Sequence, residues 1–162
     1  GEFLFSVAQE NPDEIFIGCE PFEMGALQLV DKIEQSGLTN IFILNDDVFL
    51  LLDKMPDNIF STIYILFPDP WPKARHNKRR IIRNENLDIF TAKLKANGRL
   101  KIATDHYDYA SWIIAHLINR PDLIWNSKSP EDLHTAFPEY VITKYYRKAK
   151  TDMKFFFDFT LT

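Results

Sequence analysis

The sequence predicts a single α/β domain over residues 1–162 with a mostly parallel sheet, on three observations. The chain has 162 residues, 46% of them hydrophobic, which suits one domain with a buried core. Short β-rich runs alternate with helical ones, as in sheets covered by helices on both faces. The last two β-rich runs lack a full helix between them, which predicts an antiparallel strand at one edge of the sheet.

Residues 1–55 are expected to form three helices and two strands. The helical segments are those in which apolar residues recur every three or four positions, and the strands are short apolar runs. Gly37 is expected to end the second helix. In chain order the elements are the helix Glu2–Glu10, the strand Ile15–Glu20, the helix Phe22–Gln35, the strand Ile41–Leu44 and the helix Val48–Met55.

The remainder of the chain is expected to add four strands and two helices by the same criteria. The last strand is almost entirely apolar, with the sequence FFFDF, so both of its faces are expected to be covered. In chain order the elements are the strand Thr62–Phe67, the helix Leu87–Lys95, the strand Gly98–Thr104, the helix Tyr107–Asn119, and the strands Leu123–Ser127 and Lys154–Leu161.

The charge balance argues against non-specific binding of nucleic acid over the whole surface. Lys and Arg number 19 and Asp and Glu number 23, which gives a formal net charge of −4. A local basic patch is compatible with this balance, because affinity for phosphate depends on where the charges lie.

Cysteine and histidine usage favours a cytoplasmic protein without a metal centre. Cys19 is the single cysteine, so neither an internal disulfide nor a zinc cluster of thiolates is expected. His76, His106, His116 and His134 are too scattered to predict a metal site, and His116, in mid-helix, is expected to pack. No apolar run approaches the roughly 20 residues of a membrane span, and no signal peptide is visible.

Acidic side chains follow four successive strands. They are Glu20, the pair Asp46 and Asp47, Asp69, and Asp105. Ligands of open α/β sheets bind beyond the carboxyl ends of the strands, so these residues are candidates for a ligand crevice. Each one alone is equally compatible with capping of the helix that follows it. For the whole set, a crevice is the better interpretation.

The segment FPDPWPKARHNKRR, residues 67–80, places a carboxylate and a tryptophan at the end of an apolar strand. Pro68 and Pro70 fix φ on both sides of Asp69, which stiffens the turn and aims the carboxylate. Trp71 offers a flat face on which a base extracted from a nucleic acid can stack. Packing of Trp71 in the core is the alternative.

The same segment concentrates positive charge, which we interpret as a set of phosphate contacts that position a nucleic acid. A solvated surface run is the alternative, but nothing acidic nearby would pair with so many charges. The basic residues are Lys73, Arg75, Lys78, Arg79 and Arg80, with Arg83 three positions past the segment. A second basic run is compatible with either interpretation and consists of Lys144, Arg147, Lys148 and Lys150.

The spacing between Gly1 and Glu20 is typical of a dinucleotide-type fold. Gly1 opens directly into a helix, and Glu20 follows nineteen positions later at a strand end. Such folds place an acidic residue about 20 positions after a glycine-rich turn, where it holds ribose hydroxyls. The chain is therefore expected to be truncated inside this turn, with its first strand and earlier glycines before residue 1.

These motifs together resemble one known family. Segment 67–80 resembles the signature of the tRNA (guanine-N7)-methyltransferases of the bacterial single-chain type. The stretches GEFL, IGCEPF, NDDV, ATDHYDYA and TKYYRKA resemble other motifs of that family and fall in its order and at its spacing. The resemblance therefore covers almost the whole chain.

The resemblance implies the Rossmann-like fold of S-adenosylmethionine-dependent methyltransferases. S-adenosylmethionine would donate the methyl group, and a guanine in the tRNA variable loop would accept it. Asp69 would be catalytic. The implied donor-binding residues are Gly1, Glu20, Asp47 and Asp69. The implied tRNA-binding residues are Lys73, Ala74, Arg75, His76, Asn77, Lys78, Arg79, Arg80, Asp105 and Thr143. The oligomeric state, monomer or homodimer, stays open.

The chain departs from the family pattern at two places. Three positions after Thr143 the family usually has Glu, whereas this chain has Tyr146. The family's first strand, its first two glycines and an acidic donor-binding residue are also absent from the chain.

Two other functions are compatible with the sequence. The turn Pro68-Asp69-Pro70-Trp71 is similar to the Asp-Pro-Pro-Tyr-type turn of amino-directed DNA and RNA methyltransferases, which act on an exocyclic amine. A chain that lacks its first strand would also suit a non-catalytic RNA-binding module.

Overall fold

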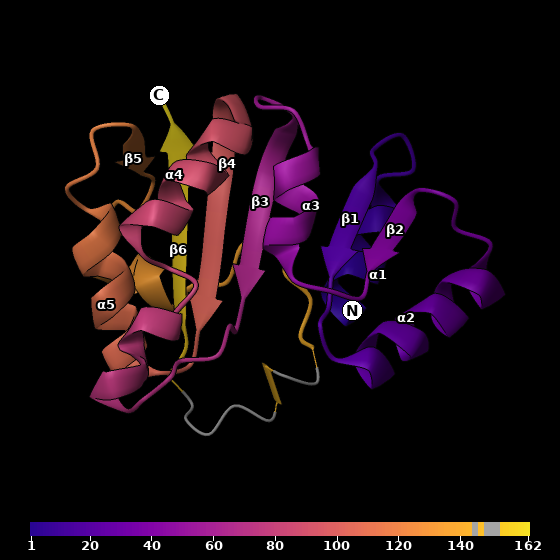
Figure 1. Ribbon diagram of the computed structural model, residues 1–162, viewed down its shortest axis with the longest axis horizontal. Helices are drawn as coiled ribbons and strands as arrows, with labels where there is room; N and C mark the ends of the chain where they lie inside the picture. The colour runs from indigo at the N-terminus through magenta and orange to yellow at the C-terminus, as the bar shows by residue number, and fades with distance from the viewer. Residues whose placement is uncertain (144–145, 148–152) are drawn as a thin grey trace. The chain divides into compact units, whose positions relative to one another are not determined.

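The computed structural model of the protein describes residues 1–143, 146–147 and 153–162. The chain forms two compact units (Figure 1). Unit 1 comprises Gly1–Lys54 and Pro138–Lys148, and unit 2 comprises Met55–Phe137 and Ala149–Thr162. The organisation of residues 1–162 as a single domain stays a prediction.

Unit 1 is built on two parallel strands, β1 (Phe16–Cys19) and β2 (Ile41–Leu44). A parallel pair needs a crossover, and α2 (Glu23–Ser36) supplies it. Gly37 ends α2 with φ of 70°, in the left-handed region where glycine meets no steric penalty. The other helices are α1 (Glu2–Glu10) and α3 (Val48–Lys54). A small apolar core contains Phe5, Ala8, Leu29 and Ile41.

Unit 2 is built on a sheet of four strands in the order β3-β4-β6-β5 (Figure 1). The helices α4 and α5 pack against β4. β3 and β4 are parallel, whereas β6 is antiparallel to both β4 and β5. The elements are β3 (Phe60–Leu66), α4 (Asn84–Lys93), β4 (Leu94–Thr104), α5 (Tyr107–Leu117), β5 (Leu123–Trp125) and β6 (Phe155–Leu161).

The structure confirms the predicted fold class and every predicted helix and strand, with ends that differ by a few residues. Antiparallel pairing is confined to the β6-β5 end of the sheet, where β6 lies between β4 and the short edge strand β5. The phenylalanines of β6 are buried, as predicted. Two 3₁₀ helices, η1 (Ala74–Arg79) and η2 (Pro130–His134), were not predicted, because both lie in polar runs without apolar periodicity.

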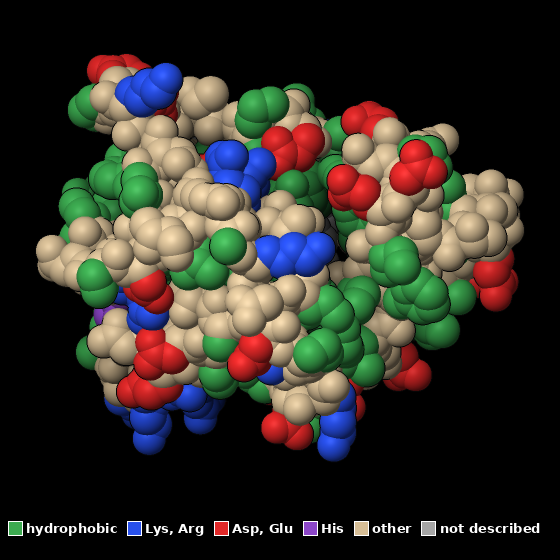
Figure 2. All heavy atoms as spheres, turned by 90° about the horizontal axis from the view of Figure 1, so that it is seen from above, with side chains coloured by type: hydrophobic (Ala, Val, Ile, Leu, Met, Phe, Trp, Pro, Cys, Tyr) green, Lys and Arg blue, Asp and Glu red, His purple; other side chains and the backbone are tan. Residues whose placement is uncertain are grey.

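The surface carries charges of both signs. In the view of Figure 2, separate groups of Lys and Arg side chains and of Asp and Glu side chains are visible on a face that is mostly uncharged. This mixture agrees with a formal net charge of −4 and makes a dense basic segment a local feature. In the part of the chain that the structure describes, no helix has the length and apolar character needed to cross a membrane.

Candidate functional site

The ends of β3 and β4 bring two of the predicted acidic residues to one edge of the unit 2 sheet. The strands are parallel with Leu66 opposite Ala103, so Asp69 and Asp105 both leave the sheet at its carboxyl edge. The Phe67 N–H donates to the Ala103 carbonyl at 2.8 Å and continues the pairing one residue past β3. The Asp69 side chain is exposed and that of Asp105 is half-buried.

The turn around Asp69 is strained. Phe67 and Trp71 have positive φ angles of 50° and 44°, a region that residues other than glycine rarely occupy. Each such residue costs on the order of 1–3 kcal/mol and persists only where the surroundings hold it. The Trp71 N–H donates to Oδ1 of Asp69 at 3.4 Å, so the carboxylate itself helps to close the turn. Strain of this kind clusters at functional sites.

Trp71 lies among basic side chains and is only half-buried. The Arg79 guanidinium lies over the indole ring, 4.9 Å from its centroid. The imidazole of His76 meets the same ring edge-on, with centroids 5.7 Å apart. Trp71 is therefore not packed in the core. Its ring lies in the turn that carries Asp69, with the Arg79 guanidinium over it.

The η1 helix presents the basic segment to solvent. Lys73, Arg75, Lys78 and Arg79 are exposed, and none of them forms an ion pair with a carboxylate of the described residues. Exposed cations without a carboxylate partner can neutralise phosphates. Arg83 differs, because it donates to the Lys78 carbonyl at 3.0 Å and lies 3.8 Å from a Glu85 oxygen.

Arg80, whose contact with RNA stays a prediction, differs from the exposed cations of the segment. Its side chain is only 1% exposed. Nε donates to the Pro70 carbonyl at 2.8 Å, and Nη2 is hydrogen-bonded and ion-paired with Asp108. The guanidinium also lies over the rings of Tyr109 and Trp112, 5.1 and 4.9 Å from their centroids. Arg80 therefore holds protein groups together, and its charge does not reach the surface.

Sequence reasoning missed this buried cluster. Burial raises the pKa of Tyr109 to about 12, although the hydrogen bond from the Ile82 N–H and the charge of Arg80 act in the opposite direction. The charge of Asp69 also raises this pKa, so Asp69 acts electrostatically on the same cluster. The sequence feature that could have indicated the burial of Arg80 is its position directly before two isoleucines.

In unit 1 the strand ends carry Glu20 and the pair Asp46 and Asp47. The Glu20 N–H donates to the Leu44 carbonyl at 3.0 Å, and the Asn45 amide donates to the Glu20 carbonyl at 2.7 Å, so the two ends lie side by side. Each carboxylate accepts a hydrogen bond from a backbone N–H one or two residues further on. Of these three, the hydrogen bond of Asp47 fits helix capping, because Phe49 lies in the first turn of α3, whereas α2 has no side-chain hydrogen bond at its N-cap Phe22.

The surroundings of Glu20 leave room for its carboxylate. A Cβ atom added at Gly25 would lie 3.2 Å from Cγ and 3.6 Å from Oε2 of Glu20, a close approach that glycine relieves. Gly1 precedes α1, and a Cβ there would lie 2.5 Å from the Leu29 side chain. Gly25 therefore gives room to the Glu20 side chain, and Gly1 gives room to Leu29 of α2.

Thr143 lies in unit 1 and is buried. Its hydroxyl accepts from the Tyr146 N–H at 3.1 Å and lies 3.2 Å from the Tyr140 hydroxyl. The Tyr146 ring packs against Tyr140 at 5.9 Å, and Tyr140 stacks on Phe3 at 5.4 Å. Tyr146 thus has a packing partner at the position where Glu was expected. Of the second basic run only Arg147 lies within the described residues.

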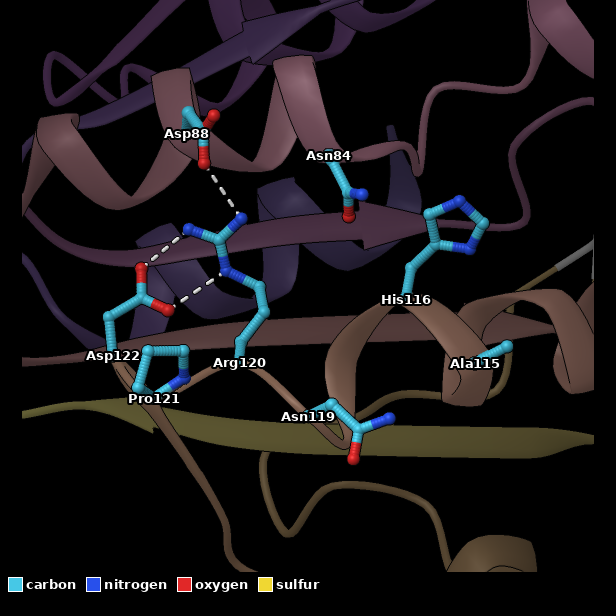
Figure 3. A pocket seen from close by; sticks show the side chains of 8 residues that line it. All are labelled: Asn84, Asp88, Ala115, His116, Asn119, Arg120, Pro121 and Asp122. Carbon is cyan, nitrogen blue, oxygen red and sulfur yellow. Dashed lines mark hydrogen bonds and ion pairs between the residues drawn. The ribbon is translucent and has the colours of Figure 1, made fainter.

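Two other histidines, and a pocket beside one of them, add no predicted site residue. His116 stacks on Trp112 at 4.3 Å, which confirms its packing role, and His106 caps α5. An open pocket of about 570 Å³ lies beside His116 (Figure 3). Arg120, which lines this pocket, is hydrogen-bonded to Asp88 and Asp122. The hydrogen bond from Arg120 lowers the pKa of Asp122. In the described ranges, no group of three or more His, Cys, Asp or Glu could hold a metal ion.

The sheet order, the parallel strand ends and the acidic residues that follow them define the Rossmann-like fold of S-adenosylmethionine-dependent methyltransferases. The structure resembles that of an S-adenosylmethionine-dependent O-methyltransferase from Thermotoga maritima, with a TM-score of 0.57 at 14% identity, covering 94% of this chain and 51% of that one. A family model described as "Putative methyltransferase" matches residues 1–158, and the chain belongs to this family.

Two curated relatives are named tRNA (guanine-N(7)-)-methyltransferase. The protein from Wolbachia pipientis wMel is 40% identical over 154 residues, which is 95% of this chain and 66% of that protein. The protein from Hyphomonas neptunium is 36% identical over 161 residues, which is 99% of this chain and 74% of that protein. The chain thus spans just under two thirds of the Wolbachia protein's length.

Proposed function

We propose that the protein transfers a methyl group from S-adenosylmethionine to N7 of a guanine in the variable loop of tRNA, in the cytoplasm. The observation that carries this proposal is the segment from Phe67 to Arg79. It combines an exposed carboxylate in a strained turn with an aromatic ring and exposed, unpaired cations. The names of the relatives support the same reaction.

The donor is proposed to bind at the carboxyl ends of β1 and β2. Oε1 of Glu20 accepts from the Phe22 N–H at 3.0 Å, which orients the carboxylate and leaves Oε2 for ribose hydroxyls. Asp47 would lie by the adenine, and Gly1 would border the donor ahead of α1. S-adenosylmethionine, when bound, supplies an electrophilic methyl group on a sulfonium.

The acceptor chemistry suits a site without a strong base. Guanine N7 carries an in-plane lone pair, so it needs no deprotonation before it attacks a methyl group, and catalysis is mainly a matter of positioning. Asp69 can accept hydrogen bonds from the guanine N1–H and exocyclic amine. Its negative charge also stabilises the cation that the base becomes. Lys73 and Asp105 would contact the guanine region.

The partner is proposed to be tRNA, gripped by the basic segment. Lys73, Arg75, Lys78 and Arg79 would neutralise phosphates while Trp71 and His76 offer ring faces to an extracted base. Ala74 and Asn77 lie on the same helix and would line the RNA. For Thr143, whose hydroxyl has two protein partners, substrate contact would require that these bonds rearrange.

The direct test is identification of the product. The protein is incubated with S-adenosylmethionine and tRNA, and the digested nucleosides are separated by mass spectrometry. We expect 7-methylguanosine that maps to the variable loop. N6-methyladenosine or N4-methylcytidine would instead show an amino-directed methyltransferase. Binding of tRNA without any methylated product would show an RNA-binding module.

A second prediction concerns the donor. Glu20→Ala should weaken S-adenosylmethionine binding about 10- to 100-fold, because hydrogen bonds to a charged group contribute roughly 1.5–3 kcal/mol. Affinity for tRNA should not change. Isothermal titration calorimetry with each ligand measures both. Glu23→Ala, an exposed carboxylate in the first turn of α2, is the matched control. Unchanged donor affinity in Glu20→Ala would leave Glu20 with a structural role only, through the hydrogen bond from the Phe22 N–H.

A further inference from the structure

Arg80 joins the turn that follows β3 to the first turn of α5. One edge of its guanidinium donates through Nε to the Pro70 carbonyl at 2.8 Å, and Pro70 directly follows Asp69. Nη2 is ion-paired with Asp108, in the first turn of α5 and three residues after Asp105. A single planar group thus bridges the turn that carries Asp69 and the start of α5.

The surroundings of Arg80 make this bridge rigid. The side chain is 1% exposed and lies over the rings of Tyr109 and Trp112. The Trp112 indole N–H donates to the Ile82 carbonyl at 2.5 Å, and the Tyr109 hydroxyl accepts from the Ile82 N–H at 3.3 Å. The backbone that follows Arg80 is therefore fixed to α5 independently of the guanidinium.

The turn needs such a bridge, because it is strained at both ends. Phe67 and Trp71 hold positive φ, and such conformations persist only where surrounding contacts impose them. The hydrogen bond inside the turn, from the Trp71 N–H to Asp69, is long at 3.4 Å. The shorter contact from Arg80 to the Pro70 carbonyl anchors this turn from outside, between its two strained residues.

We propose that Arg80 is a positioning residue that holds Asp69, through the Pro70 carbonyl, in a fixed position relative to the first turn of α5. It makes no contact with the RNA. Lys cannot replace it, because one ammonium on a flexible stem lacks the planar fork that spans two acceptors. This inference rests on the proposed methyl transfer for its kinetic consequences only, since the geometry of the turn can be measured without activity.

The kinetic test compares Arg80→Lys with Arg120→Lys. Arg120 is an arginine of unit 2 that also bridges two groups, Asp88 and Asp122, away from the turn. Arg80→Lys should lower kcat about 10- to 100-fold, because small misplacements of a reacting group have effects of that size. KM for tRNA and the salt dependence of binding should stay unchanged. Arg120→Lys should keep the wild-type kcat.

A double mutant shows whether Arg80 acts through Asp69. Added to Asp69→Ala, Arg80→Lys should cause no further loss of kcat, because residues that work as a unit are non-additive. Asp108→Asn removes the ion pair between Asp108 and Arg80. Because the Asp108 side chain is 65% exposed, this substitution should disturb folding less than one at the buried Arg80. It should also lower kcat. A further full loss in the double mutant would overturn the proposal.

Hydrogen exchange of the peptide covering residues 64–73 tests the bridge without any turnover. Arg80→Lys should speed exchange of the Trp71 amide at least tenfold, and Arg120→Lys should not. If the protein transferred no methyl group, this measurement alone would decide whether Arg80 holds the turn. Unchanged exchange of the Trp71 amide in Arg80→Lys would overturn the proposal that Arg80 holds the turn. A phosphate contact would be shown instead if Arg80→Ala lowered the salt slope of tRNA binding by about 0.7–0.9.

Discussion

Asp69→Ala should lower the turnover of methyl transfer by roughly 10²–10³-fold, the usual effect of losing one preorganised electrostatic partner of a transition state. The carboxylate is exposed, and its one internal hydrogen bond, from the Trp71 N–H, is long at 3.4 Å. Removing it should therefore cost at most about 0.5 kcal/mol of folding stability, or about 1–2 °C in Tm. Single-turnover rates and thermal unfolding measure the two quantities.

Two further variants separate charge from structure. Asp69→Asn keeps the size of the side chain and its acceptor oxygen for Trp71 but removes the negative charge. If the charge stabilises the cationic product, Asp69→Asn should be nearly as slow as Asp69→Ala. Asp53→Ala, an exposed carboxylate of α3 that lies 3.8 Å from the Lys54 ammonium, should turn over normally. Wild-type turnover by Asp69→Ala would refute the assignment.

The secondary structure could be predicted because it depends on local periodicity. The apolar stripe of residues 2–10 and the buried run of β6 each indicate their element without knowledge of any distant residue. The placement of Asp69 and Asp105 at one edge was predictable for the same reason, since it follows from parallel strands.

The role of Arg80 could not be predicted in this way. In the sequence it is one of several neighbouring cations, and its burial depends on Asp108, 28 positions away, and on two rings of α5. The strain at Trp71 is likewise invisible in composition, because nothing in the residue type indicates a positive φ. Tertiary contacts decide both features.

The four remaining cations of the segment should carry the affinity for tRNA. Lys73, Arg75, Lys78 and Arg79 are exposed and have no carboxylate partner among the described residues. Replacing Arg75, Lys78 and Arg79 with Ala should weaken tRNA binding most at low salt. Each lost phosphate contact reduces the slope of log affinity against log salt by about 0.7–0.9, so the triple variant should flatten it by roughly 2–3 units.

The matched control removes the same number of positive charges elsewhere. Lys54, Lys95 and Lys128 are exposed and lie outside the basic segment, so their replacement by Ala should leave the salt slope unchanged. Affinity for S-adenosylmethionine should be the same in both triple variants, because the proposed ribose and adenine contacts come from β1 and β2. A basic-segment variant that kept both its tRNA affinity and its salt slope would show a solvated surface, and the RNA would then bind elsewhere on the protein.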